Sequence, residues 1–195
     1  MTRVCLVGVE DVNLRYELLS RETARNALAT YDLREPFDNA IGLETVSLGA
    51  AVALLNDLNW YLVRFVDEAM VLEPSVSETE WLSRDLAAAV RDDEVAPDEA
   101  ARFLKVYGLE SQGSDGEDED ETEATHGRTD ASASGNSDST DRTDDGQSRD
   151  GDPAGRKRLV EPMFVTRTGD GVPDYDLRDV EETLVERVTE SEFGA

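Results

Sequence analysis

Apolar side chains recur along this chain with two different periods, which predict a mixture of helices and strands. Apolar residues three or four positions apart are typical of a half-buried helix, whereas short apolar or alternating runs are typical of strands. Helices are predicted at residues 12–29, 47–59, 77–90 and 97–108. Strands are predicted at residues 4–7, 31–37, 60–66, 69–72 and 163–168. The order of these elements predicts an α+β (or small α/β) sandwich domain with a mixed sheet and about four helices.

Local signals mark the ends of two of these helices. Ser77 and Glu80 are spaced as a capping box, which starts a helix. Pro97 suits the first turn of a further helix, and Gly108 suits its C-terminal end. The last stretch is ambiguous, because residues 183–189 fit a helical stripe but are rich in β-branched side chains. We expect a turn or short helix at 177–182 and then a strand, with a helix as the alternative.

The composition changes abruptly in the middle of the chain. Residues 111–157 contain no Val, Ile, Leu, Met, Phe, Trp, Tyr or Cys, and they are rich in acidic residues, Ser, Thr and Gly. A segment of this kind buries too little apolar area to offset the entropy of ordering, so we predict a disordered acidic insertion. Residues 1–110 are predicted to form the main part of the domain, and residues 158–195 to pack back onto it. A separately flexible tail is the alternative.

The charge of the chain indicates its environment. There are 45 acidic and 19 basic side chains, for a formal net charge of −26, and only Lys105 and Lys157 are lysines. Such repulsion opposes compaction unless molar salt shortens the screening length to about 3 Å. We therefore expect a halophilic protein that needs high salt, the alternative being an acidic mesophilic protein with a charged tail. The same charge argues against nucleic-acid binding. No apolar run suits a membrane span, and no signal peptide is evident, so a cytoplasmic location is expected.

The chain lacks the residues that several kinds of catalysis require. The chain has one cysteine, Cys5, and one histidine, His126, and it contains neither a phosphate-binding P-loop nor a Gly-x-Gly-x-x-Gly motif. Cys5 lies among apolar neighbours and is predicted to be a buried structural thiol, while His126 falls in the insertion. Lys105 is predicted to be exposed on a helix. No cofactor is predicted.

Two acidic groups suggest a metal-dependent alternative. Glu10 and Asp11 follow the first predicted strand, where they could hold a divalent cation through oxygen ligands. The same pair resembles the start of a response-regulator receiver domain, although the phosphorylatable Asp and the Lys of that pattern are missing. A second acidic group comprises Asp170, Asp174, Asp176 and Asp179, and its spacing is not that of an EF-hand. These residues leave a carboxylate-based, metal-dependent hydrolase as an alternative function.

One helical stripe is a candidate contact surface. Leu14, Leu18, Arg21 and Arg25 recur at helical spacing on the first predicted helix, away from the stripe of Val12 and Tyr16. Arginine pairs with carboxylates and stacks on apolar surfaces, which suits an interface with a protein partner or a second copy. The structural alternative is that this stripe is also buried.

Several stretches together resemble a known family. They are MTRVCLVG, VNLRYELLSRETARNALATYDLREP, LLNDLNWYLVRF, EPSVSETEWLSRDL, KVYG, EPMFVTRT and YDLRDVEETLVERVTESEF. They resemble a haloarchaeal protein family of unknown function, which assigns no catalytic or binding residue. The sequence as a whole predicts a non-enzymatic module that acts through protein contacts or a small regulatory ligand.

Overall fold

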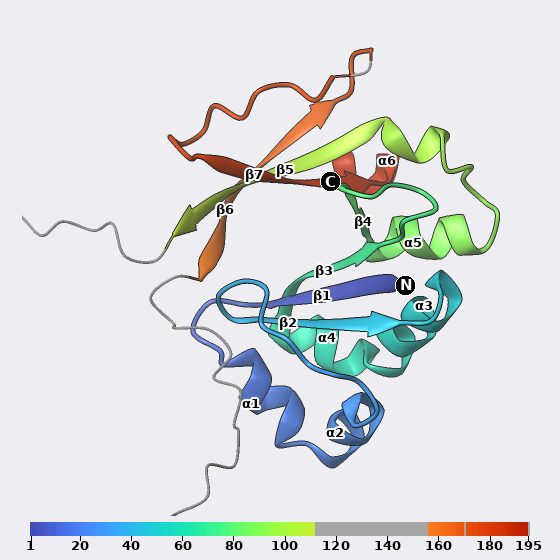
Figure 1. Ribbon diagram of the computed structural model, residues 1–195, viewed down its shortest axis with the longest axis vertical. Helices are drawn as coiled ribbons and strands as arrows, with labels where there is room; N and C mark the ends of the chain where they lie inside the picture. The colour runs from blue at the N-terminus through green and yellow to red at the C-terminus, as the bar shows by residue number, and fades with distance from the viewer. Residues whose placement is uncertain (112–155, 170, 195) are drawn as a thin grey trace, which may run out of the picture.

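A seven-stranded mixed sheet organises the chain (Figure 1). The computed structural model describes residues 1–111, 156–169 and 171–194, and the predicted insertion falls largely outside the described residues. The strand order is β2-β1-β3-β4-β7-β5-β6, so strands from both ends of the chain lie in the same sheet. The predicted α+β class is confirmed, with six α-helices and one short 3-10 helix among the described residues.

The first half of the sheet comes from the N-terminal part of the chain. Strand β1 (Thr2–Gly8) lies between β2 (Ala40–Thr45) and β3 (Val66–Leu72), and it is antiparallel to both. A receiver domain has a parallel sheet, so the receiver alternative is wrong. Both faces of β1 are covered, because Val4 and Leu6 face one core while Cys5 faces another.

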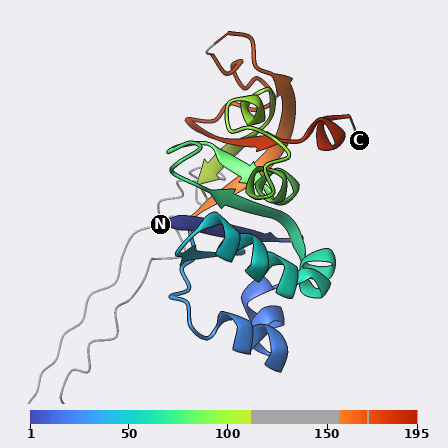
Figure 2. The same cartoon turned by 90° about the vertical axis from the view of Figure 1, so that its right-hand side faces the viewer.

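Helices cover one face of this sheet. They are α1 (Leu14–Leu19), α2 (Glu22–Leu28), α3 (Leu48–Asp57), α4 (Asn59–Phe65) and α5 (Arg84–Arg91). Figure 2 shows these helices, from blue α1 to green α5, along the strands. The side chain of Ser47 caps α3, as the sequence predicts, by accepting a hydrogen bond from the Ala50 amide. The apolar faces of the helices bury the larger of the two cores against the sheet.

The second half of the sheet brings the two ends of the chain together. Its strands are β4 (Trp81–Ser83), β5 (Phe103–Ser111), β6 (Lys157–Thr166) and β7 (Glu182–Val188). Strands β4 and β7 run parallel, whereas β5 is antiparallel to both β6 and β7. The 3-10 helix η1 (Glu99–Ala101) precedes β5, and α6 (Glu190–Phe193) follows β7. Ser111 and Lys157, the outermost residues of the predicted insertion, pair with each other in the β5–β6 ladder.

The edges of the sheet approach each other at one end. The Asp38 amide, just before edge strand β2, donates a hydrogen bond of 2.8 Å to the Lys157 carbonyl of edge strand β6. Arg156 and Glu35 form an ion pair at the same place. In Figure 1 this end of β6 lies beside the loop that precedes β2. The sheet is therefore curved, and its concave face carries the second, smaller core of Cys5, Ala40, Met70, Tyr107 and Leu184.

Five sequence predictions need correction. Residues 31–37 form no strand: Arg34 makes only an isolated bridge to Gly42, and strand β2 begins at Ala40. Residues 60–65 lie in helix α4 rather than in a strand, and residues 103–108, with Gly108 among them, lie in strand β5 rather than in a helix. Residues 12–29 are divided into two short helices, because Ser20 and Arg21 interrupt the helical hydrogen bonding. Ser77 accepts hydrogen bonds from Thr79 and Glu80 in a turn, and the helix begins only after the short strand β4. The expected strand over 183–189 is confirmed as β7.

Candidate functional site

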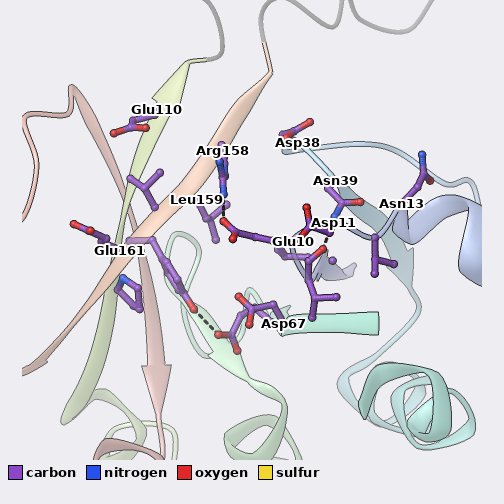
Figure 3. Close-up of a pocket in the computed structure, with 18 of the residues that line it drawn as sticks. Glu10, Asp11, Asn13, Asp38, Asn39, Asp67, Glu110, Arg158, Leu159 and Glu161 are labelled. Carbon is purple, nitrogen blue, oxygen red and sulfur yellow. Dashed lines mark hydrogen bonds and ion pairs between the residues drawn. The ribbon is translucent and has the colours of Figure 1, made fainter. Parts of the chain in front are cut away.

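A cavity of about 1070 Å³ opens where the two edges of the sheet come together (Figure 3). Its walls come from the end of β1, the loop before β2, the start of β3, and strands β5 and β6. Segments far apart in the sequence therefore converge on one site, which only the folded sheet assembles.

The end of β1 gives the cavity a fixed wall. The Asn39 side chain accepts a hydrogen bond of 2.9 Å from the Leu14 amide and donates one of 3.2 Å to the Val9 carbonyl. Gly8 packs against it so closely that a Cβ atom there would lie 2.5 Å from Asn39 Nδ2. Gly8, the last residue of β1, is thus required by packing.

Carboxylates dominate the lining of the cavity. Among the described residues these are Glu10, Asp11, Asp38, Asp67, Glu68, Glu110 and Glu161. The lining includes two arginines, and both are paired with lining carboxylates. Arg158 pairs with Glu10, and Arg178 lies 3.0 Å from Glu110 and 3.1 Å from Glu161. The hydrogen bond from Arg178 also lowers the pKa of Glu161. The cavity therefore keeps a large excess of negative charge at neutral pH.

The backbone of the lining is unusual. Four non-glycine residues among those described have positive φ angles, and three of them line the cavity. They are Asp11 (φ 65°), Asn39 (φ 49°) and Glu161 (φ 24°). Such conformations are costly for L-residues and tend to occur near functional sites. The backbone of the cavity wall is therefore held in a strained conformation at these three residues.

A buried polar group lies at the base of the cavity. Oε2 of Glu68 on β3 accepts hydrogen bonds from both the Lys105 ammonium and the Tyr107 hydroxyl of β5. Burial, followed by the Glu68 charge, raises the pKa of Tyr107, so its hydroxyl remains a donor. The Lys105 ammonium also lies 5.0 Å from the Tyr107 ring centroid and 5.6 Å from that of Phe164. Glu68 and Tyr107 both line the cavity.

Glu186 extends this polar group into the sheet. It is 0% exposed and lies opposite Lys105 in the β5–β7 ladder. Its carboxylate oxygens form no hydrogen bond of ordinary geometry in the described part of the chain, although the carboxyl lies close enough to Glu68 to interact with it. Burial, and then the nearby Glu68 charge, raise its pKa well above the usual value, although Lys105 partly opposes the shift. Burial therefore favours the neutral, protonated form of Glu186.

The structure places some of the predicted metal-binding and catalytic residues at the cavity and others away from it. Glu10 and Asp11 both line the cavity, but across the described residues no group of three acidic, His or Cys side chains is arranged to hold a metal ion. Asp174, Asp176 and Asp179 lie outside the lining, while Asp170 and His126 lie outside the described residues. Burial, followed by the Glu186 charge, raises the pKa of Cys5 to about 12, so the thiol stays protonated.

Comparison with known proteins identifies the family. The model of the family of unknown function DUF5804 matches residues 2–109, which is more than half of the chain. The chain belongs to the DUF5804 family. No curated protein and no solved structure matches it. No helix in the described parts of this DUF5804 chain is both long and apolar enough to cross a membrane.

The predicted contact stripe is divided between core and surface. Leu14 and Leu18 are fully buried against the sheet, whereas Arg25 is exposed and Arg21 is half-buried. Tyr16, which the sequence placed on the buried stripe, is 67% exposed. Helix α1 begins only at Leu14, after Val12, and the face that it turns toward the core is that of Leu14 and Leu18.

Arg21 belongs to a surface that the sequence did not indicate. We name it the Trp–Arg patch, and it consists of Arg21, Trp60, Val63 and Arg64. Arg64 stacks 4.3 Å from the Trp60 ring centroid, and Arg21 lies 5.7 Å from the same ring. Trp60 is 50% exposed and Val63 is 78% exposed. The remaining face of Arg21 pairs with Glu17 at 2.7 Å.

Sequence reasoning missed the polar group at the base of the cavity. Lys105 was expected to be exposed on a helix, but it is mostly buried in β5 and paired with Glu68. The available signal was the alternation of Lys105, Tyr107 and Leu109, which has the period of a strand. No spacing could have linked Glu68 to Glu186, because their strands are separated by more than a hundred residues.

Proposed function

We propose that this protein is a non-enzymatic module that binds a small organic cation, one carrying amine or guanidine groups, in the cavity on the concave face of its sheet. The observation that carries the proposal is the convergence of seven carboxylates and two internally paired arginines around a cavity of about 1070 Å³. Cavities of several hundred Å³ are typical of small-molecule sites. A guanidinium or ammonium group matches the carboxylates in charge and in hydrogen bonding.

The shape of the site supports a ligand of defined geometry. Two ion-paired clusters and the Asn39 hydrogen bonds hold the walls, so little ordering is required when a ligand enters. Tyr107 and Glu68 offer polar groups at the base, while Val7 and Leu159 offer apolar contacts. A cation with an aliphatic spacer fits this combination of charged and apolar surface.

The test uses agmatine, which carries a guanidinium and an ammonium group on an aliphatic chain. Calorimetry on the full chain in molar KCl should show saturable binding of agmatine and none of adipate, a dianion of comparable length. The double variant Asp11→Asn with Asp67→Asn should weaken binding by about tenfold, as expected for two partly screened charges. Asparagine retains the size of aspartate and tolerates the positive φ of residue 11.

The matched control changes two carboxylates outside the cavity. Asp57→Asn with Asp93→Asn removes the same charge, and residue 93 also has a positive φ of 58°. Because neither residue lines the cavity, agmatine affinity should stay at the wild-type value. Equal weakening by both double variants would mean that only the overall charge attracts agmatine, which would overturn the proposed site.

Self-association is a second candidate function, favoured by the composition of the Trp–Arg patch. Exposed Trp and Arg are the residue types that contribute most to protein interfaces. The patch is basic, whereas the rest of a chain of net charge −26 offers an excess of carboxylates, so a second copy presents the complementary charge.

The environment expected from the sequence belongs to the same proposal. An acid-rich, lysine-poor composition supports a haloarchaeal, cytoplasmic protein that folds in high salt. Residues 1–110 and 158–195 are proposed to form one domain, and their shared strand pairings support this. A protease cut between residues 111 and 157 should leave two fragments that elute together on gel filtration, and fragments that separate would contradict a single domain.

A further inference from the structure

The buried carboxyl of Glu186 is a polar group whose position no structural role explains. It lies in the middle of β7, between Trp81 of β4 and Lys105 of β5 in the strand register. It is completely buried, its oxygens form no hydrogen bond of ordinary geometry in the described part of the chain, and Glu68, itself an acid, is close enough to interact with its proton. Buried polar groups without partners are rare, and each one needs an explanation.

The surroundings of Glu186 make it responsive to charge. The titratable groups that face it from the neighbouring elements are Cys5 of β1, Glu68 of β3, Lys105 and Tyr107 of β5, and Glu192 of α6. Among these only Lys105 is positive, and its ammonium is already paired with Glu68. The neutral acid therefore balances the group, because Glu68 and Lys105 cancel and a second carboxylate would leave an uncompensated buried charge.

Glu68 connects this buried acid to the cavity. Its carboxylate lines the cavity wall and at the same time raises the pKa of Glu186 by its charge. A cation bound beside Glu68 offsets that charge in a region of low dielectric, where such interactions are strong. The same cation attracts the ionised form of Glu186 directly. Both effects favour ionisation of Glu186 when the cavity is occupied.

We propose that a cation entering the cavity releases the proton of Glu186 to solvent, so that the module exchanges one positive charge for another. This inference rests on the cation-binding function proposed above. The Glu186 O–H bond breaks, its electron pair stays on the carboxylate, and the proton leaves with the solvent buffer. The net charge of the buried group together with its neighbouring cation is the same before and after a monovalent exchange.

Proton release imposes a pH dependence on binding. Each proton displaced makes the cation affinity rise with pH, by up to about tenfold per pH unit for one proton. The linkage is reciprocal, so a bound cation lowers the pKa of Glu186. Agmatine itself keeps both positive groups from about pH 6 to about pH 8, so its own titration does not contribute in this range.

The experiment counts protons in the full-length protein. Calorimetry with agmatine in molar KCl is repeated in two buffers that differ in ionisation enthalpy and at several pH values. The wild-type enthalpy should depend on the buffer, by an amount equivalent to between zero and one proton, and the Kd should tighten as pH rises. Glu186→Gln carries no titratable proton, so its agmatine binding enthalpy should be independent of the buffer and its Kd independent of pH. The exposed variant Glu181→Gln should behave as wild type.

A spectroscopic measurement on the wild-type protein covers the case in which Glu186→Gln does not fold. The infrared carbonyl band of a protonated carboxylic acid should be present without ligand and should decrease when agmatine is added. Binding that is independent of buffer and pH, with an unchanged carboxylic acid band, would overturn proton exchange but leave cation binding standing. Absence of any agmatine binding would instead overturn the proposed function.

Discussion

Glu186 lies directly opposite Lys105 in the β5–β7 ladder, but the Lys105 ammonium pairs with Glu68 and forms no hydrogen bond with the Glu186 carboxyl. Cross-strand neighbours of opposite charge normally stabilise a sheet by pairing with each other. Here Lys105 instead pairs with Glu68, which lines the cavity. The arrangement maintains a charged group at the cavity wall, and its cost is a buried acid that must stay protonated.

The first prediction concerns stability as a function of pH. Burial holds the pKa of Glu186 well above its usual value of 4.5, so above pH 4.5 the folded protein keeps a proton that the unfolded chain loses. Wild-type stability should therefore fall as pH rises above 4.5, until the pH passes the folded-state pKa. Glu186→Gln should remove this slope and raise the thermal midpoint at neutral pH. Thermal melts from about pH 5 to about pH 8 test this, and curves parallel to those of Glu181→Gln would contradict it.

The second prediction concerns the carboxylate that joins the two halves of the sheet. Glu80 accepts hydrogen bonds of 2.5 Å from Arg167 and 2.6 Å from Arg187. Glu80→Ala leaves both guanidinium groups partly buried and unpaired, and it should lower the free energy of unfolding by about 2–4 kcal/mol. Chemical denaturation measures this loss. The exposed variant Glu78→Ala should change stability by less than about 0.5 kcal/mol, and similar values for both variants would contradict the prediction.

The stabilisation that Glu80 provides should also depend on pH in the acidic range. Burial alone would raise the pKa of Glu80, but the hydrogen bonds from Arg167 and Arg187 outweigh it and hold the pKa below 4.5. A carboxyl with a lowered pKa stabilises the folded state above its unfolded-state value and loses that contribution as pH falls through the folded-state value. The difference in stability between wild type and Glu80→Ala should therefore shrink below pH 4.5.

How much of this the sequence could predict differs from element to element. Strand 4–7 and the helix capped by Ser47 were predicted correctly, because an apolar run and a capping residue are local signals. Residues 60–66 were assigned to a strand from the alternation of Tyr61, Val63 and Phe65, but residues 60–65 lie in α4. In a run this short both periods fit, and packing of Leu62 into the core decides between them.

The residues of the candidate site were harder to predict from local sequence signals than the helices and strands. Glu10 and Asp11 were recognised as candidate ligands because they follow a strand, and both line the cavity. Glu68 and Glu186 were not recognised, since each is an ordinary acid in an acid-rich chain. Their roles arise from the order of strands β3, β4, β7 and β5, which places the two acids on one face. That order depends on long-range pairing and not on local spacing.

The third prediction concerns the Trp–Arg patch. If a second copy docks there, sedimentation in molar KCl should show concentration-dependent association of the wild-type protein. Arg21→Glu with Arg64→Glu should remove the association while the circular dichroism spectrum stays intact, because both arginines lie beside Trp60 and the change reverses the charge there. Arg91→Glu, on the exposed side of α5, is the control and should associate as wild type does. A wild-type protein that is monomeric at all concentrations would exclude this function.

The last prediction concerns salt. The net charge of −26 includes the seven carboxylates that face one another around the cavity. Lowering the salt from about 1 M to about 0.1 M lengthens the screening distance from about 3 Å to about 10 Å, so these charges begin to repel across the cavity. Circular dichroism should therefore show cooperative loss of structure on dialysis from molar to millimolar KCl. Asp11→Asn with Asp67→Asn should shift the midpoint to lower salt more than the matched pair Asp57→Asn with Asp93→Asn, because only the first pair relieves repulsion inside the cavity. Equal shifts would mean that the repulsion is spread over the whole surface, and a fold unchanged at low salt would contradict adaptation to high salt altogether.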